Sequence, residues 1–415
     1  MAPLLLVAAG ANACASLSGL SGGGSDASTD ASVPRDATRP EGGRDASTEA
    51  SLRVPDGRAD TADAMPCTTC GGACVDITSD PTNCGGCGVT CRQCTNGYCL
   101  NYLDQGDPGQ YMPALAFLPP LVYWAGAADG GDDLVTGDVL DASVPKPERV
   151  LEMFSTAPLA LAADRQSVFV GGAGYLAAFT PPSPLSASDG GLVVLNTGLT
   201  YFDAGVVRTA NSVAVDDTNV YWSDSTTNAV LEMPKSGGQV VTLVPDQFSV
   251  TGVATDSSFV YWLADGSLYR ISATGVTTPT TLAAATTTGT GPTPLVVHGG
   301  QVYFPDTVGS RILSIFATGG TPIPFATDQP NVTALATDGT SLYWTTNEPT
   351  GCALVKQPLA GGVPVTIASF GEADVVLPGG LALSAPPDGG AMGTTVFVSA
   401  NISGAGVLLA ISPPP

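Results

Sequence analysis

The sequence predicts an all-β protein built from repeated four-stranded units, and two observations carry that prediction. First, short runs of strand-forming residues alternate with turn residues. Within residues 211–244 four such runs are separated by Asp216-Asp217, by residues 225–228 and by Ser236-Gly237-Gly238. Second, this pattern returns about every 40 to 54 residues along the chain. That period, with four strands per unit, is typical of β-propeller blades, so we expect seven four-stranded blades, with six as the alternative.

Aromatic pairs mark the second strand of the units. Neighbouring residues on a strand point to opposite faces, so a Tyr-Trp pair places one ring on each face of its sheet. Such a strand needs cover on both sides, as in a blade that lies between two others. All four tryptophans of the chain occupy this position. The seven anchors are Tyr123-Trp124, Phe169-Val170, Tyr221-Trp222, Tyr261-Trp262, Tyr303-Phe304, Tyr343-Trp344 and Phe397-Val398.

The strand before each pair carries small residues, as in Val213-Ala214-Val215, which suits an innermost strand near a crowded axis. An aspartate follows this strand in three units, at Asp216, Asp256 and Asp338. We interpret these aspartates as turn caps rather than metal ligands, because Asp side chains bond to the backbone of tight turns. His298, the single histidine of the chain, occupies the equivalent slot and is interpreted as a turn residue rather than a catalyst.

Two of the anchors carry a recognisable motif. Tyr221-Trp222-Ser223-Asp224 and Tyr343-Trp344-Thr345-Thr346 resemble the repeats of YWTD-type propellers, as in the extracellular part of lipoprotein receptors. The resemblance spans roughly 300 residues, although each motif is short. It implies a propeller, but that family has six blades against the seven anchors counted here.

Composition narrows the classes of function. The chain has 415 residues, of which 44% are hydrophobic and 12% charged, with a net charge of −23. Residues 101–415, the predicted propeller, hold 26 acidic and 8 basic residues, a balance of −18. Such a surface repels phosphate backbones, so no nucleic-acid partner is expected. With one histidine, a His-rich metal site cannot be built and a catalytic triad has a single candidate base.

The N-terminus predicts export. Residues 1–14 read as a short apolar signal segment, and Ala11-Asn12-Ala13-Cys14 resembles a bacterial lipobox, which implies lipid attachment to Cys14. The match departs at two points: no Lys or Arg precedes the apolar run, and Ala11 replaces the usual Leu, so cleavage after Ala13 is the alternative. Residues 15–65 contain few large apolar side chains and are expected to form a disordered tether. The predicted location is secreted or on the outer membrane or cell surface, with membrane contact only through the lipid.

Residues 66–100 form a module with eight cysteines. Cys67-x-x-Cys70 and Cys84-x-x-Cys87 have zinc-ribbon-like spacing, but an even count behind an export signal favours four disulfides of open connectivity. The stretch from Asp80 to Gly88, Asp-Pro-Thr-Asn-Cys-Gly-Gly-Cys-Gly, resembles the Stig1-like module, which implies an extracellular setting and no activity. The cysteines are Cys67, Cys70, Cys74, Cys84, Cys87, Cys91, Cys94 and Cys99.

Two acidic groups are weaker candidates for a cation, with Ca²⁺ the ion that carboxylates would take. Asp76 and Asp80 are more readily explained as turn residues. Asp129, Asp132 and Asp133 are more readily explained as a solvated acidic loop.

The leading functional hypothesis is an exported, lipid-anchored binding module for a protein or carbohydrate at the cell surface. The alternatives are a cation-dependent propeller lyase or lactonase and a structural component of the cell surface, with no catalytic residue identified. Two structural expectations complete the set. The apolar run at residues 98–103 is expected to be the outermost strand of the last blade, joining the chain ends. Cys352, which has no nearby partner along the sequence, is expected to be a small or buried residue of the sixth blade.

Overall fold

The computed structural model describes residues 68–108, 114–119, 121–128, 131–138, 148–154, 158–179, 209–273, 278–284, 293–348, 351–371, 380–384, 393–402 and 405–414. Every regular element in these residues is a β-strand. No helix in this part of the chain has the length and hydropathy needed to cross a membrane. The predicted signal segment and tether, with Cys14, lie outside the described residues.

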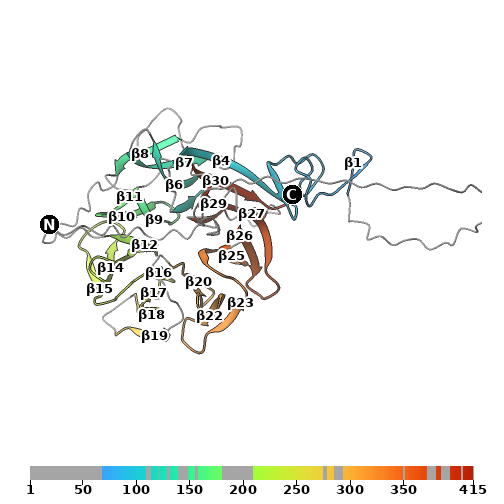
Figure 1. Ribbon diagram of the computed structural model, residues 1–415. Coiled ribbons are helices and arrows are strands. Elements are labelled where there is room, and N and C mark those ends of the chain that lie inside the picture. The colour runs from blue at the N-terminus through green and yellow to red at the C-terminus, as the bar shows by residue number, and fades with distance from the viewer. Residues whose placement is uncertain are drawn as a thin grey trace, which may run out of the picture. The chain divides into compact units, whose positions relative to one another are not determined.

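Seven antiparallel sheets follow one another along the chain (Figure 1). The first contains β5 (Leu115–Leu118), β6 (Leu121–Ala128), β7 (Gly131–Asp138) and β8 (Glu148–Phe154). The second shows three strands among the described residues, β9 (Pro158–Ala163), β10 (Val168–Gly172) and β11 (Tyr175–Phe179). The third contains β12 (Ala210–Val215), β13 (Asn219–Asp224), β14 (Ala229–Pro234) and β15 (Val241–Val244).

The next three sheets repeat the same strand order. The fourth contains β16 (Gly252–Thr255), β17 (Phe259–Ala264), β18 (Ser267–Ser272) and β19 (Thr280–Ala283). The fifth contains β20 (Val296–His298), β21 (Gln301–Asp306), β22 (Arg311–Phe316) and β23 (Ile323–Ala326). The sixth contains β24 (Val332–Thr337), β25 (Ser341–Glu348), β26 (Gly351–Pro358) and β27 (Val365–Gly371).

The seventh sheet joins the two ends of the propeller. Its strands β28 (Leu381–Ser384), β29 (Thr395–Ile402) and β30 (Ala405–Ser412) are followed in space by β4 (Tyr98–Pro108). Strand β4 pairs antiparallel with β30, with Tyr102 opposite Leu409 and Leu100 opposite Ile411. The predicted closing strand is therefore confirmed, and it extends to Pro108 rather than ending at residue 103.

The innermost strands close a ring. Contacts run from β5 to β9, β12, β16, β20, β24 and β28 in turn, and β28 contacts β5 again. The ring therefore has seven blades, and six of them show four propeller strands. The fold prediction is confirmed, and the seven-bladed form is the one observed rather than the six blades of the YWTD family.

Burial of the aromatic anchors explains why the blades associate. The anchor tryptophans are at most 2% exposed, as are the tyrosines beside them in the same four blades. In each pair the first residue packs toward the next blade and the second toward the preceding blade, so that Tyr221 shares a buried cluster with Trp262 and Phe169 shares one with Trp222. The two side chains of a pair therefore contribute to different interfaces between blades, as the alternation of side chains on a strand requires.

The cysteine-rich module contains a short hairpin of β1 (Thr68–Cys70) and β2 (Ala73–Val75), and β3 (Gln93–Thr95), which pairs with β4. Three disulfides join Cys70 to Cys87, Cys84 to Cys94 and Cys91 to Cys99. Cys74 is also disulfide-bonded, and Cys67 lies outside the described residues. These bonds leave none of the described module cysteines as a free thiolate for zinc.

Cys352 differs from expectation. It is buried, at 2% exposure, as expected, but it is disulfide-bonded. The prediction relied on the lack of a cysteine near position 352 in the sequence, but a disulfide partner need not lie close along the chain.

Candidate functional site

The propeller presents two loop faces, which follow from the antiparallel order of strands in each blade. The inner-turn face carries the turns between first and second strands, at residues 164–167, 216–218, 256–258, 299–300 and 338–340. The connection face lies at the other end of the strands. It carries the turns between second and third strands and the segments between blades, at residues 225–228, 245–251, 265–266, 307–310 and 327–331.

The aspartates of the inner-turn face cap their own turns. Oδ1 of Asp216 accepts the backbone N–H groups of Thr218 and Asn219, each at 2.7 Å. Its Oδ2 accepts the hydroxyl of Tyr221 at 2.9 Å. The turn-cap interpretation is therefore supported by geometry, and the tyrosine partner is an addition that sequence reasoning missed.

The same three-point arrangement recurs in two further blades. Tyr261 donates to Asp256 and Tyr343 donates to Asp338, both at 2.8 Å. The tyrosine lies five residues after its aspartate each time, so the spacing Asp-x₄-Tyr is the sequence signal that could have revealed the bond.

Asp338 also links two blades. Its Oδ2 accepts the hydroxyl of Thr394, which precedes β29 in the seventh blade, at 2.8 Å. Burial alone would raise the pKa of Asp338, but hydrogen bonds from Thr340, Thr394 and the backbone of Ser341 outweigh it and lower the pKa to about 2. The acceptor positions of this carboxylate are thus used by protein donors, which leaves little capacity for a metal ion.

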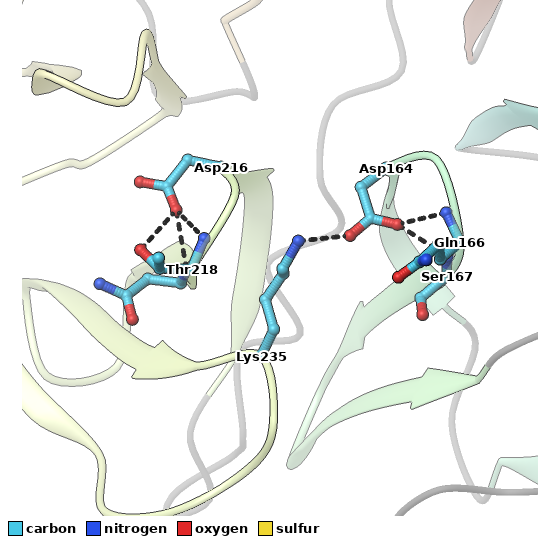
Figure 2. A network of polar contacts seen from close by, with 7 residues as sticks. Asp164, Gln166, Ser167, Asp216, Thr218 and Lys235 are labelled. Carbon is cyan, nitrogen blue, oxygen red and sulfur yellow. Dashed lines mark hydrogen bonds and ion pairs between the residues drawn. The ribbon is translucent and has the colours of Figure 1, made fainter.

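An ion pair joins the second and third blades (Figure 2). Lys235, just after β14, reaches Oδ2 of Asp164 at 2.6 Å, while Oδ1 of Asp164 accepts the N–H groups of Gln166 and Ser167 at 2.7 Å. Figure 2 shows the lysine extending between the two turns, with Asp216 on its other side. Both side chains of the pair keep about a fifth of their surface exposed, so the pair positions the blades more than it stabilises them.

Glu232 has surroundings that disfavour a charged carboxylate. Burial and then the charge of Asp216 raise its pKa, and its Oε2 is buried without a hydrogen-bond partner in the described structure. Within the described residues no group of three or more His, Cys, Asp or Glu side chains could hold a metal ion.

His298 ends β20 on the inner-turn face and is exposed. Its imidazole lies beside the next blade's turn, where a Cβ on Gly339 would approach its Cε1 to 3.4 Å. The structure therefore places His298 at a turn, as expected.

Glutamines organise the connection face. Oε1 of Gln247 accepts the indole N–H of Trp262 at 2.8 Å, while its backbone N–H donates to Asn228 of the preceding blade. Gln329 repeats this with Trp344 at 2.7 Å and with the carbonyl of Ser310. Each glutamine thus fastens a connection to the blades on both sides. The available signal in the sequence was a repeated Asp-Gln pair, whose glutamine lies fifteen residues before Trp262 in one blade and before Trp344 in the other.

Asp224, which ends the YWTD-like motif of the third blade, and Asp306, at the equivalent position of the fifth blade, are also used internally. Asp224, fully buried, accepts the N–H of Thr226 at 2.8 Å and the hydroxyl of Thr227 at 2.7 Å. Asp306, 5% exposed, accepts Nε of Arg311 at 2.7 Å. By contrast Phe248 and Val308, on the same face, are each 67% exposed.

The two weaker cation candidates have different outcomes. Asp76 accepts hydrogen bonds from the hydroxyls of Thr78 and Ser79. Asp80 accepts hydrogen bonds from the backbone N–H and the hydroxyl of Thr82, so both aspartates cap turns of the module. Asp129 and the side chains of Asp132 and Asp133 lie outside the described residues.

Comparison with known proteins supports the architecture. No protein-family model and no curated protein sequence matches the chain. A streptogramin B lyase structure matches with a TM-score of 0.55 and 11% identity, over 76% of this chain and 98% of that one. Virginiamycin B lyase from Staphylococcus aureus matches with a TM-score of 0.55 and 10% identity, over 76% and 99%. A nidogen/laminin complex matches at a TM-score of 0.38 and 15% identity, over 51% and 77%, too weakly to support an argument. At these identities the lyase matches show a shared propeller fold alone.

Proposed function

We propose that this protein is an exported binding module whose connection face recognises a protein or carbohydrate partner at the cell surface. The observation that carries the proposal is the unequal length of the segments between blades. After the blades in which four propeller strands are described, they range from three residues between β8 and β9 to twelve between β19 and β20, whereas six of the seven inner turns have two to four residues. Variable loops on a rigid scaffold are where binding specificity is usually placed.

The chemistry of the described part agrees with binding more than with catalysis. Asp216, Asp256 and Asp338 are engaged in turn caps, and the inner strands carry mainly small and aliphatic side chains. Phe248 offers an apolar contact on the connection face, with exposed Asp246 and Asp265 close to it in the same loops. The N–H of Asp265 donates to the carbonyl of Phe248 at 3.0 Å, which brings these two loops together.

Selection experiments test the proposal. The purified protein would be screened with a displayed peptide library and a glycan array, and each binder retested on Phe248→Ser, Val308→Ser and the control Val363→Ser. Val363 is 79% exposed and lies between β26 and β27, the third and fourth strands of the sixth blade, which places it on the inner-turn face. We expect binding to fall at least tenfold in the first two variants and to persist in the control. Binders lost only in the control would contradict the face assignment.

A lyase is the second candidate, favoured by the extent of the fold match. One matching structure, with a TM-score of 0.53 and 12% identity over 75% of this chain and 99% of that one, is a catalytically inactive His-to-Ala variant of virginiamycin B lyase with quinupristin. In the present chain the corresponding chemistry would depend on His298. Incubation with quinupristin, followed by chromatography, should show loss of the antibiotic with the native protein and not with His298→Ala. Unchanged quinupristin would remove this candidate.

Attachment through a lipid on Cys14 stays a prediction of the sequence. Mass spectrometry of the N-terminal peptide from the native host distinguishes a lipid thioether on Cys14 from a free or disulfide-bonded cysteine.

A further inference from the structure

The cysteine-rich module sits on the seam where the propeller ring closes. Strand β4 belongs to both parts, since it pairs with β30 of the seventh blade on one side and with β3 of the module on the other. Tyr98, Leu100 and Tyr102 contribute to the core between the sixth and seventh blades. Leu103 packs into the core between the seventh and first blades. One strand therefore reaches both interfaces of the closing blade.

The module holds this strand from two directions. The side-chain N–H of Asn96, in the β3–β4 turn, donates to the carbonyl of Thr366 on β27 at 2.7 Å, so the turn is fixed to the sixth blade. Gly85 packs against the C-terminal segment so closely that a Cβ there would lie 2.7 Å from Cβ of Pro414. The module thus contacts β27 of the sixth blade and the end of the seventh.

Two disulfides connect these contacts. Cys99 lies on β4 opposite Ser412 and is bonded to Cys91, while Cys94 on β3 is bonded to Cys84. Cys84, Cys91 and Cys99 form a small buried cluster, each at most 9% exposed. The disulfide between Cys70 and Cys87 differs, because Cys87 is exposed and the bond ties the β1–β2 hairpin to the module's own loop.

We propose that the module is a redox-sensitive clamp on ring closure, with the Cys91–Cys99 disulfide as the element that keeps β4 in the seventh blade. A small dithiol reduces the bond by passing two electrons and two protons to the sulfurs, giving two cysteine thiols and a cyclic disulfide. Reduction frees the loop before Cys91 from β4 and so increases the conformational freedom that the clamp had removed. The ring then opens more readily at the edge of β30, where an unpaired strand is prone to association.

Paired variants of the full chain test the clamp. Thermal unfolding would be followed by tryptophan fluorescence, since all four tryptophans belong to the propeller. Cys91→Ser with Cys99→Ser should lower the midpoint by more than about 4 °C, whereas the control Cys70→Ser with Cys87→Ser should change it by about 1 °C or less. Equal midpoints in the two double variants would overturn the proposal.

Hydrogen exchange keeps the test decisive if the clamp variant does not fold. The native protein would be treated with dithiothreitol and the exchange of peptides from β4 and β17 compared. We expect exchange in residues 98–108 to accelerate at least tenfold once Cys91 and Cys99 are reduced, with residues 259–264 unchanged at that time. The exposed Cys70–Cys87 bond should be reduced earlier without either effect. Unchanged exchange in β4 after reduction of Cys91 and Cys99 would contradict the clamp.

Discussion

Phe397 in the last blade shares a buried cluster with Trp124 in the first blade. This is the same relationship that joins Tyr221 to Trp262 and Tyr303 to Trp344 between consecutive blades. The first and last blades therefore meet through the ordinary interface of the repeat. The closed ring is a consequence of this shared packing rule together with the closing strand β4.

Replacement of the anchor tryptophans should destabilise the propeller by similar amounts. Trp222, Trp262 and Trp344 are each at most 2% exposed between two blades, so each Trp→Ala change should cost about 3–5 kcal/mol of unfolding free energy. Urea unfolding measures this cost. Quenching by acrylamide provides the check on burial, because a readily quenched tryptophan in the folded protein would show that its blade interface is wrong.

Gln329 should matter more than an exposed glutamine. Gln329→Leu removes the acceptor for the buried indole N–H of Trp344, and an unsatisfied buried donor costs about 1–3 kcal/mol. The matched control is Gln239→Leu, on the exposed turn after β14, which should lie within about 0.5 kcal/mol of the native protein. Equal effects of the two changes would show that the connection does not depend on the glutamine–indole bond.

The pKa of Asp338 predicts a specific pH dependence. Because folding lowers this pKa to about 2 from an ordinary 3.8, the ionised carboxylate favours the folded state. That contribution is fully present above about pH 4 and is lost as the pH falls toward about 2. The stability difference between the native protein and Asp338→Asn should therefore shrink across this window and stay constant from about pH 5 to 7. A difference that does not vary with pH would contradict the assignment.

The repeat could be predicted from the sequence because its strongest signal, the aromatic pair, is set by local alternation on one strand. Tyr261-Trp262 announces a strand covered on both faces whatever the distant sequence. Asp256 could likewise be interpreted as a turn cap, because the bonds to Ser258 and Phe259 are local. The number of blades was left open, since Phe169-Val170 and Phe397-Val398 lack tryptophan and are recognisable only through the neighbours they pack against.

The contacts between blades were harder to predict. The bond from Lys235 to Asp164 spans 71 residues and depends on how two adjacent turns face each other. The disulfide of Cys352 was missed because no other cysteine lies near this residue along the chain. Closing strand β4 was predictable because the last blade had three strands and one apolar run remained unassigned, which is an argument about completeness rather than about local pattern.

The central claim is that β4 completes the seventh blade and closes the ring. Its most direct test compares the thermal midpoint of a chain starting at Pro66 with that of a chain starting at Gly109, which lacks β4 and the module. The longer chain should retain the midpoint of the full protein, because residues 1–65 precede every described strand. The shorter chain should aggregate or melt more than about 5 °C lower. Identical midpoints, with both chains monomeric, would contradict closure by β4.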